Sequence, residues 1–273
     1  MRLPAFFGVH AAPPRWLARL LVVAPFALLI VVYLIASHVR LAENPDDKIL
    51  PSFEQMAGAV DRLAFSRDER SGEFVMLRDT LSSLQRLGLG IALSAAVGLL
   101  LGMNMALFPG MGIPLIGMVT FISIVPPLAV LPILFITFGV DELAKVMLIF
   151  LGTFPLITRD IYGAVKAMPQ EQLTKALTLG ANELQLVYRI VLPQITPRLI
   201  DTVRLSLGGG WLFLIAAEAI ASTDGLGYRI FLVRRYLAMD VIIPYVLWIT
   251  LIGFTIDWSL RAIVRRRYRW YAS

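Results

Sequence analysis

Length, composition and charge place the chain in a membrane. It has 273 residues, of which 58% are hydrophobic and only 16% are charged, whereas a soluble domain carries about 25% charged residues. It has no cysteine, which excludes disulfides and thiol chemistry, and two histidines are too few for a histidine metal cluster. The net charge of +6 comes mostly from basic residues at the ends of apolar runs, as membrane topology requires. We therefore expect a contact with the lipid bilayer and no binding of nucleic acid.

Six apolar runs approach the roughly 20 residues that a membrane-spanning helix needs. In chain order they cover residues 17–36, 84–108, 113–138, 143–158, 199–221 and 241–264. The third is rich in proline, and the fourth is short and interrupted by Gly152 and Pro155. The pattern predicts an all-α membrane protein with about six transmembrane helices.

The first run has a signal peptide as its alternative. Its apolar stretch is long for a signal peptide, and Ile35-Ala36-Ser37 is a poor cleavage site. We therefore expect residues 1–36 to hold an N-terminal tail and a retained first span. Residues 37–83 then form a loop, residues 84–264 a transmembrane core, and residues 265–273 a basic tail.

Orientation follows from lysine and arginine, which are enriched on the cytoplasmic side. These residues gather before the first run, between runs four and five, and after the last run; examples are Arg2, Arg15, Arg19, Arg159, Lys166, Lys175, Arg189, Arg198, Arg265, Arg266 and Arg267. With six spans, all three regions lie on one side, so both termini are expected to be cytoplasmic. The loop 37–83 is then external, with a short amphipathic helix at 53–65 capped by Ser52. Arg229, Arg234 and Arg235 would also lie outside, against this trend.

The segment 170–197 is too polar to span. Apolar or small residues recur in it at helical spacing: Leu173, Leu177, Gly180, Leu184, Val187 and Val191. Gly180-Ala181-Asn182 is a turn candidate, and Pro193 and Pro197 are expected to close the segment because proline interrupts helices. We predict a helix-turn-helix on the cytoplasmic face; the alternative is an ordinary amphipathic loop.

This segment resembles the cytoplasmic signature of permease subunits of binding-protein-dependent ABC importers. That signature reads E-A-A, three residues, G, nine residues, then I-x-L-P. The chain has Thr174-Lys175-Ala176, then Gly180, then Ile190-Val191-Leu192-Pro193, at the same spacing. Thr174 and Lys175 stand where the family has Glu and its first Ala.

Further motifs resemble the nitrate, sulfonate and taurine branch of that family, over about residues 77–270. They are Val125-Pro126-Pro127, Leu131-Pro132-Ile133, Phe138-Gly139, Phe154-Pro155, Ala217-Glu218 and Gly225-Leu226-Gly227-Tyr228. The resemblance implies the type I importer permease fold in the inner (plasma) membrane. It also implies alternating access driven by ATP, and a small anion such as nitrate, sulfonate, taurine or bicarbonate as solute.

The resemblance implies partners as well. They are a second copy of this chain, two ABC ATPase subunits and an extracytoplasmic solute-binding protein. The residues implied to contact the ATPase are Thr174, Lys175, Ala176, Gly180, Ala181, Ile190, Leu192 and Pro193. The loop near residues 225–235 is the candidate contact for the binding protein.

Known catalytic motifs are absent from the sequence. A phosphate-binding loop needs a glycine before a lysine and Ser or Thr, and no glycine precedes a lysine here. The zinc-protease H-E-x-x-H and hydrolase G-x-S-x-G patterns are missing too. We expect no catalytic residue, no metal and no cofactor on this chain, with ATP and Mg bound by the ATPase subunit. The rival functions are an ATP-independent channel or secondary transporter, a membrane enzyme, and a receptor or assembly scaffold.

Ionisable residues in the spans suggest a translocation pathway. Run five holds Arg204 and Glu218, about 21 Å apart on a helix. They join a stripe that faces either the pathway or the partner subunit: Arg204, Gly208, Trp211, Ile215 and Glu218. Pro126 and Pro127 are expected to distort run three, and broken helices often line cavities. The alternative is that Arg204 and Glu218 are structural, with Glu218 bonding a neighbouring loop.

Two smaller patterns predict structural contacts. Gly98 and Gly102 form a G-x-x-x-G motif, and Gly208-Gly209-Gly210 also admits close helix packing or a bend. Asp257 and Arg261 lie four residues apart, so they can pair across one helical turn.

Overall fold

The computed structural model describes residues 13–45, 47–69 and 72–271, and their regular secondary structure is entirely helical. Arg2, one of the predicted cytoplasmic charges, lies outside these residues. The helices are α1 Arg15–Glu43, α2 Phe53–Val60, α3 Val75–Leu107, α4 Pro109–Ile124, α5 Pro127–Phe138, α6 Glu142–Lys166, α7 Gln170–Thr178, α8 Glu183–Leu186, α9 Leu192–Ile220, α10 Leu226–Arg234 and α11 Met239–Arg267. Short π-helical stretches, Asp61–Phe65 and Val187–Val191, follow α2 and α8.

Five helices in the described part of the chain are long and apolar enough to cross a membrane. They are α1, α3, α6, the continuous helix Glu183–Ile220 and α11. The bent pair α4–α5 makes a sixth if it counts as one span. The prediction of an all-α membrane protein with about six transmembrane helices is confirmed.

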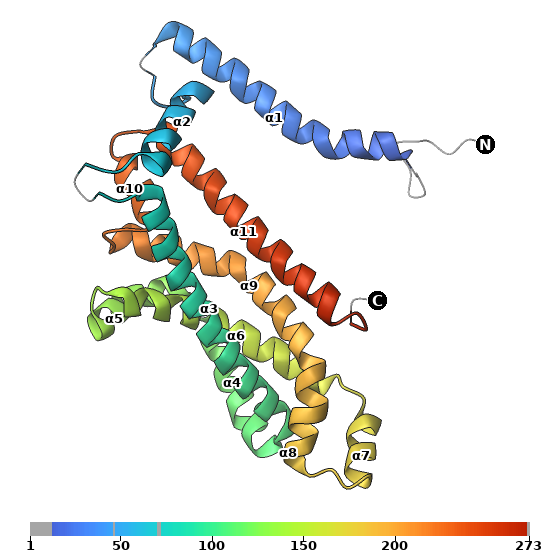
Figure 1. Ribbon diagram of the computed structural model, residues 1–273. Coiled ribbons are helices and arrows are strands. Elements are labelled where there is room, and N and C mark those ends of the chain that lie inside the picture. The colour runs from blue at the N-terminus through green and yellow to red at the C-terminus, as the bar shows by residue number, and fades with distance from the viewer. Residues whose placement is uncertain (1–12, 46, 70–71, 272–273) are drawn as a thin grey trace.

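Helices α3, α6 and α9 form the centre of the bundle (Figure 1). Glycines let α3 approach α6 closely. A Cβ atom at Gly102 would lie 2.6 Å from the carbonyl oxygen of Thr158, and one at Gly98 would lie 2.7 Å from the Ile157 side chain. The packing role predicted for the G-x-x-x-G motif is therefore confirmed.

Run three differs from its prediction as a single distorted span. It forms two helices, α4 and α5, which meet at an angle of 96°. Val125 is extended, with ψ 122°, and Pro126 and Pro127 begin α5. Proline offers no N–H and disfavours a helical residue before it, so two in succession break the span.

Run five begins earlier than predicted, because Pro193 and Pro197 do not end a helix. The helix continues from Glu183 to Ile220 through both prolines. Just before Pro193, the N–H of Leu192 bonds to the carbonyl of Val187, five residues back. This π turn accommodates the proline, which lies in the first turn of α9.

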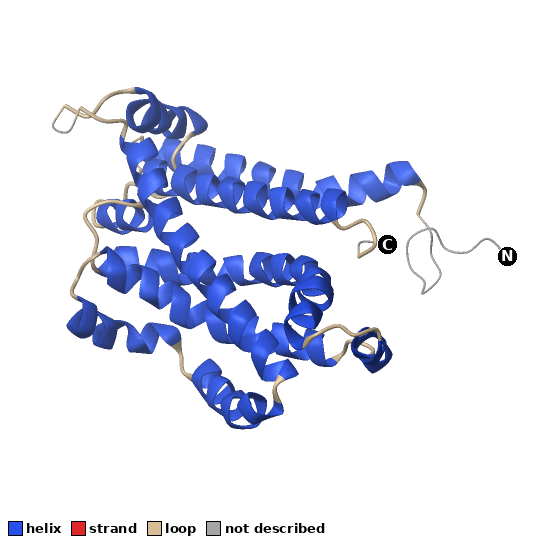
Figure 2. Ribbon diagram, turned by 60° about the horizontal axis from the view of Figure 1, so that its bottom comes forward, coloured by secondary structure: helices blue, strands red, loops and turns tan. Residues whose placement is uncertain are grey.

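Helix α1 lies at the edge of the molecule, and α11 is likewise mostly exposed (Figures 1 and 2). Only 6% of the apolar window of α1 is buried, so its side chains are available to lipid or to another subunit. Its C-terminal half is held by the Tyr33 hydroxyl, which donates to the carbonyl of Pro51 at 2.6 Å.

The short helix predicted at 53–65 is present as α2 and its π-helical extension, while its external location stays a prediction. The Ser52 side chain accepts the N–H of Gln55, so the predicted cap is also confirmed. Helix α3 already begins at Val75, within the stretch 37–83 that the sequence assigned to the external loop. The first turns of α3 were not predicted as part of the span, because the span was predicted from apolar residues and these turns carry Arg78 and Asp79.

Candidate functional site

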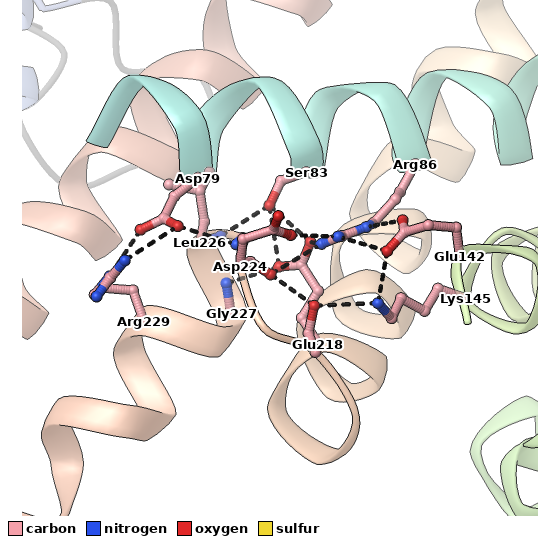
Figure 3. Close-up of polar contacts among 12 residues, drawn as sticks. Asp79, Ser83, Arg86, Glu142, Lys145, Glu218, Asp224, Leu226, Gly227 and Arg229 are labelled. Atoms are coloured by element: carbon pink, nitrogen blue, oxygen red, sulfur yellow. Dashed lines mark hydrogen bonds and ion pairs between the residues drawn. The ribbon is translucent and has the colours of Figure 1, made fainter. Parts of the chain in front are cut away.

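The sequence-predicted site residues fall in two regions. The first is residues 170–197, which we call the coupling segment after the role predicted for it; it projects from the bundle at α7 and α8 (Figure 1). The second contains Glu218 and is a group of polar residues, most of them buried, where α3, α6, α9 and α10 meet. The predicted topology puts this group toward the external side, so we call it the outer cluster; it consists of Asp79, Ser83, Arg86, Glu142, Lys145, Glu218, Asp224 and Arg229 (Figure 3).

The coupling segment folds as the predicted helix-turn-helix. Helix α7 ends at a turn in which Gly180 has φ +86°, a left-handed conformation that favours glycine. The Asn182 side chain then accepts the N–H of Gln185 at 2.8 Å, and Gln185 returns a bond to the N–H of Asn182 at 3.2 Å. This capping box starts α8, so local sequence specifies the turn.

One face of the coupling segment is anchored and the other is open. Ala176 and Val191 are buried, and Val191 packs with Ile157 and Ile161 of α6. Ile190 and Leu192 are half-buried. By contrast Thr174, Lys175, Gly180 and Pro193 are exposed, with Ala181 half-buried. Thr174, Lys175 and Leu179 border a hollow of about 650 Å³ on α7.

The apolar content of the open face is high for a projecting segment. Leu179 is 88% exposed and Leu184 is 68% exposed. Exposed apolar groups that cluster on a polar-rimmed surface are typical of protein interfaces. The chemistry available here is docking, since α7 carries only Glu171 and Lys175 as charged residues.

The stripe on α9 contacts helices of the same chain. Arg204 donates to Asp257 of α11 at 2.9 Å and to Asp201 at 2.5 Å. Asp257 also accepts from Arg261 at 3.0 Å, which confirms that predicted pair. Trp211 is buried, and its Nε1 lies 3.5 Å from the position of a Cβ on Gly253 of α11.

Glu218, at the other end of the stripe, is completely buried. It accepts hydrogen bonds from Ser83 at 2.8 Å, from Arg86 at 2.7 Å and from the N–H of Gly227 at 2.8 Å. These contacts match the structural alternative, in which Glu218 bonds a neighbouring loop. The pathway role of the stripe stays a prediction.

The remaining stripe positions are less constrained. Gly208 has open space around its Cβ position, whereas Ile215 lies against Gly227 of α10. Pro126 and Pro127 sit apart from the stripe, at the break between α4 and α5.

Arg86 is the centre of the outer cluster (Figure 3). Its guanidinium bonds both oxygens of Glu142, at 2.5 and 2.8 Å, and also reaches Glu218 and Asp224, at 2.7 and 2.5 Å. Only 4% of the Arg86 side chain is exposed. Lys145 adds a bond to Glu142 at 2.8 Å, so three helices and one loop share this set of charges.

Asp79 supplies the second half of the cluster. It accepts from Arg229 at 2.8 Å, from the Tyr245 hydroxyl at 3.1 Å and from the N–H of Gly225 at 3.1 Å. Gly225 has φ +112°, and a Cβ there would lie 2.5 Å from Glu218. Only glycine fits this conformation and this space.

The electrostatics of the cluster favour a structural role. Arg86, Lys145 and Arg229 each contact a carboxylate of this chain. A free anion would have to displace those carboxylates. These ion pairs and hydrogen bonds hold residues 222–229 against α3 and α6.

Sequence reasoning found Glu218 but missed its partners. Arg86 lies inside run two, and an arginine inside a span is itself a signal of a protein-facing contact. Asp79, Ser83 and Arg86 are spaced by four and three residues, so they share one helical face. Together these two features would have pointed to a polar face on α3.

Comparison with known proteins places the fold. Residues 94–269 match the model of the family described as binding-protein-dependent transport system inner membrane component. The taurine transport system permease protein TauC of Escherichia coli (strain K12) is 34% identical over 190 residues, which are 70% of this chain and 69% of that protein. The bicarbonate transport system permease protein CmpB of Synechococcus elongatus is 28% identical over 192 residues, 68% of this chain and 69% of that protein.

Solved structures agree. The MetNI methionine ABC transporter, in an inward-facing form, superposes with a TM-score of 0.59 at 18% identity over 68% of this chain and 93% of that chain. A bacterial alginate ABC transporter superposes with a TM-score of 0.61 at 13% identity over 93% of this chain and 98% of that chain. At such identities the likeness shows the fold, and the family match covers most of the chain. The chain therefore belongs to the family of binding-protein-dependent transport system inner membrane components, as a multi-pass ABC transporter permease.

Proposed function

We propose that this chain forms the translocation pathway of an ATP-driven importer for a small anion such as taurine, another sulfonate, nitrate or bicarbonate. The observation that carries the proposal is the coupling segment, a glycine-turned helix pair that projects from the bundle with exposed apolar residues. The named functions of the taurine and bicarbonate relatives support the class of solute.

The proposal includes the complete transporter, in which the coupling segment is the surface that meets the ATPase. A second copy of the chain completes the pathway, and each copy docks one ATPase subunit through the coupling segment. ATP and Mg bind those subunits, and this chain needs no cofactor. The coupling segment and the C-terminal residues Trp270 and Tyr271 lie at the same end, since the tail borders a hollow with Met168, just before α7. This closeness supports a cytoplasmic C-terminus.

The external binding protein docks at the other end. There a hollow of about 840 Å³ lies between α2, the loop before it and the α10–α11 connection, and its lining includes Asp47, Arg62 and Asp240. Hydrogen bonds from the N–H of Ile49 and from Arg40 hold the pKa of Asp47 below its ordinary value. Asp47 therefore keeps a negative charge on this face at neutral pH.

Reconstitution tests the proposal. The chain is expressed together with a candidate ABC ATPase and a candidate secreted binding protein, purified, and placed in liposomes. We expect the ATPase to co-purify and uptake of taurine, nitrate or bicarbonate to require ATP. Gly180→Ala should impair uptake, because alanine is strained at φ +86°.

Gly88→Ala is the matched control. Gly88 is helical and has open space around its Cβ position, so alanine there should leave uptake unchanged. Solute flux that is independent of ATP, from a chain that purifies alone, would establish a channel or secondary transporter instead.

A further inference from the structure

The hollow that Met168 and the C-terminal residues border has no binding role in the transport function proposed above. It has a volume of about 490 Å³ and lies between α6, α9 and the C-terminal residues. The small residues Gly163 and Ala164 of α6, and Ala167 at its C-cap, leave the space open, and Trp270 and Tyr271 border it. Gly163 has no atom within 4 Å of its Cβ position.

The hollow carries an excess of positive charge. Arg159 and Arg198 both line it. Arg198 is matched by Asp160, which it contacts at 2.8 and 2.5 Å. Arg159 donates to the Ser123 hydroxyl at 3.0 Å and contacts no carboxylate of the described chain. Because a guanidinium has five N–H donors in a planar fork, Arg159 keeps several for a ligand.

The neighbouring C-terminal residues extend this charge. Among residues 13–45, 47–69 and 72–271, Arg265, Arg266, Arg267 and Arg269 form no ion pair, and no acidic residue follows Asp257. Tyr268 and Trp270 meet edge to face at 6.5 Å, and Trp270 and Tyr271 do so at 6.0 Å. Arginine and aromatic residues at the end of a membrane helix mark the level of the lipid headgroups.

Arg159 lies close enough to the end of its helix to reach the level of the lipid headgroups. It lies seven residues before the end of α6, which is about 10 Å along the helix axis. Helix α11, which leads into the basic tail, has only 11% of its apolar window buried. The hollow thus adjoins a helix that faces lipid, so a membrane lipid can reach it from the side.

We propose that this hollow binds the headgroup of an anionic phospholipid, with its phosphate on Arg159 and its rim formed by Trp270 and Tyr271. Basic pockets between membrane helices on the cytoplasmic side are known to hold such headgroups. The site depends on neither the transported solute nor the ATPase. Gln194 and Ile195 of the coupling segment line the hollow, and Gln194 donates a hydrogen bond to Gln172 of α7 at 3.2 Å.

The test measures lipid binding by the full-length chain. The protein is placed in nanodiscs that contain phosphatidylcholine and a minor fraction of phosphatidylglycerol with the same acyl chains, and retained lipid is counted by native mass spectrometry. We expect enrichment of phosphatidylglycerol and a loss of about fivefold in its relative affinity for Arg159→Gln, the usual effect of one arginine at a membrane surface. Gly163→Leu, which fills the hollow without changing charge, should cause a similar loss.

Arg235→Gln is the control, since it removes an exposed arginine that precedes α11, at the opposite end of that helix from Trp270 and Tyr271; it should leave the preference intact. Thermal unfolding in pure phosphatidylcholine shows that each variant is folded. Equal phosphatidylglycerol enrichment in the wild type and in both variants would overturn the proposal. So would competition by millimolar inorganic phosphate, which would make this a soluble-anion site. Loss of the bound lipid whenever the ATPase is attached would assign the hollow to the protein interface instead.

Discussion

The outer cluster and the coupling segment are held in opposite ways. In the outer cluster, charges far apart in sequence pair with one another, and Asp79, Arg86 and Glu218 at its centre are buried. In the coupling segment, bonds between near neighbours fix the turn, and much of the apolar surface stays exposed. The first arrangement closes a surface and the second leaves one for a partner. Substitutions should therefore cost stability in the outer cluster and function in the coupling segment.

The largest expected effect is at Arg86. Arg86→Met leaves the fully buried Glu218 without its cation, and removing one partner of a buried ion pair costs about 3–5 kcal/mol. Thermal unfolding of the protein in nanodiscs measures the loss. Arg62→Met is the control, because Arg62 is exposed and its contact with Asp240 is long, at 3.5 Å. That pair should contribute about 0–1 kcal/mol.

A second variant separates charge from packing. If Arg86 acts by compensating Glu218, then Glu218→Gln combined with Arg86→Met should cost less than the sum of the two single changes. Strict additivity, or an Arg86→Met protein as stable as Arg62→Met, would contradict a charge-paired outer cluster.

The next largest effect is expected at the contact between α3 and α6. Gly102→Ala puts a methyl group 2.6 Å from the backbone oxygen of Thr158, and overpacking of this kind costs about 1–3 kcal/mol. Gly88→Ala on the open face of the same helix should be neutral or stabilising, because alanine favours helix. Unfolding midpoints of the two variants check this. If the Gly102→Ala and Gly88→Ala proteins unfold at the same midpoint, α3 and α6 can move apart to accommodate the added methyl group without loss of stability.

The sequence was sufficient for features that depend on local pattern. Apolar length predicted the spans, and the Gly180 turn and the Ser52 cap followed from neighbouring residues. The outer cluster could not be found that way, because Arg86 and Glu218 are 132 residues apart and Asp79 and Arg229 are 150 apart. One sequence carries no information on which distant charges meet. The broken α4–α5 pair lies between these cases: prolines predicted a distortion, but only packing determines an angle of 96°.

A smaller effect is expected at Tyr245. Tyr245→Phe removes the hydroxyl that donates to Asp79, while Asp79 keeps Arg229 and the N–H of Gly225. Loss of one hydrogen bond from a group that retains others costs about 1 kcal/mol. Chemical unfolding in mild detergent measures the change, with Tyr228→Phe as the control. A loss as large as that of Arg86→Met would show that Asp79 depends on this hydroxyl alone.

The smallest effect on stability, and the sharpest contrast in function, is expected in α7 and at its C-cap residue, Leu179. Leu179 is 88% exposed, so Leu179→Asn should change the free energy of unfolding by no more than about 0.5 kcal/mol. If this side chain docks the ATPase, the same variant loses ATP-dependent uptake. Leu173→Asn, on the face that packs against the buried cluster of Val191 and Ile195, should instead destabilise the chain by about 1–3 kcal/mol. Unfolding and uptake measured on both variants decide the matter: if Leu179→Asn transports normally, the exposed face of α7 is not where the ATPase binds.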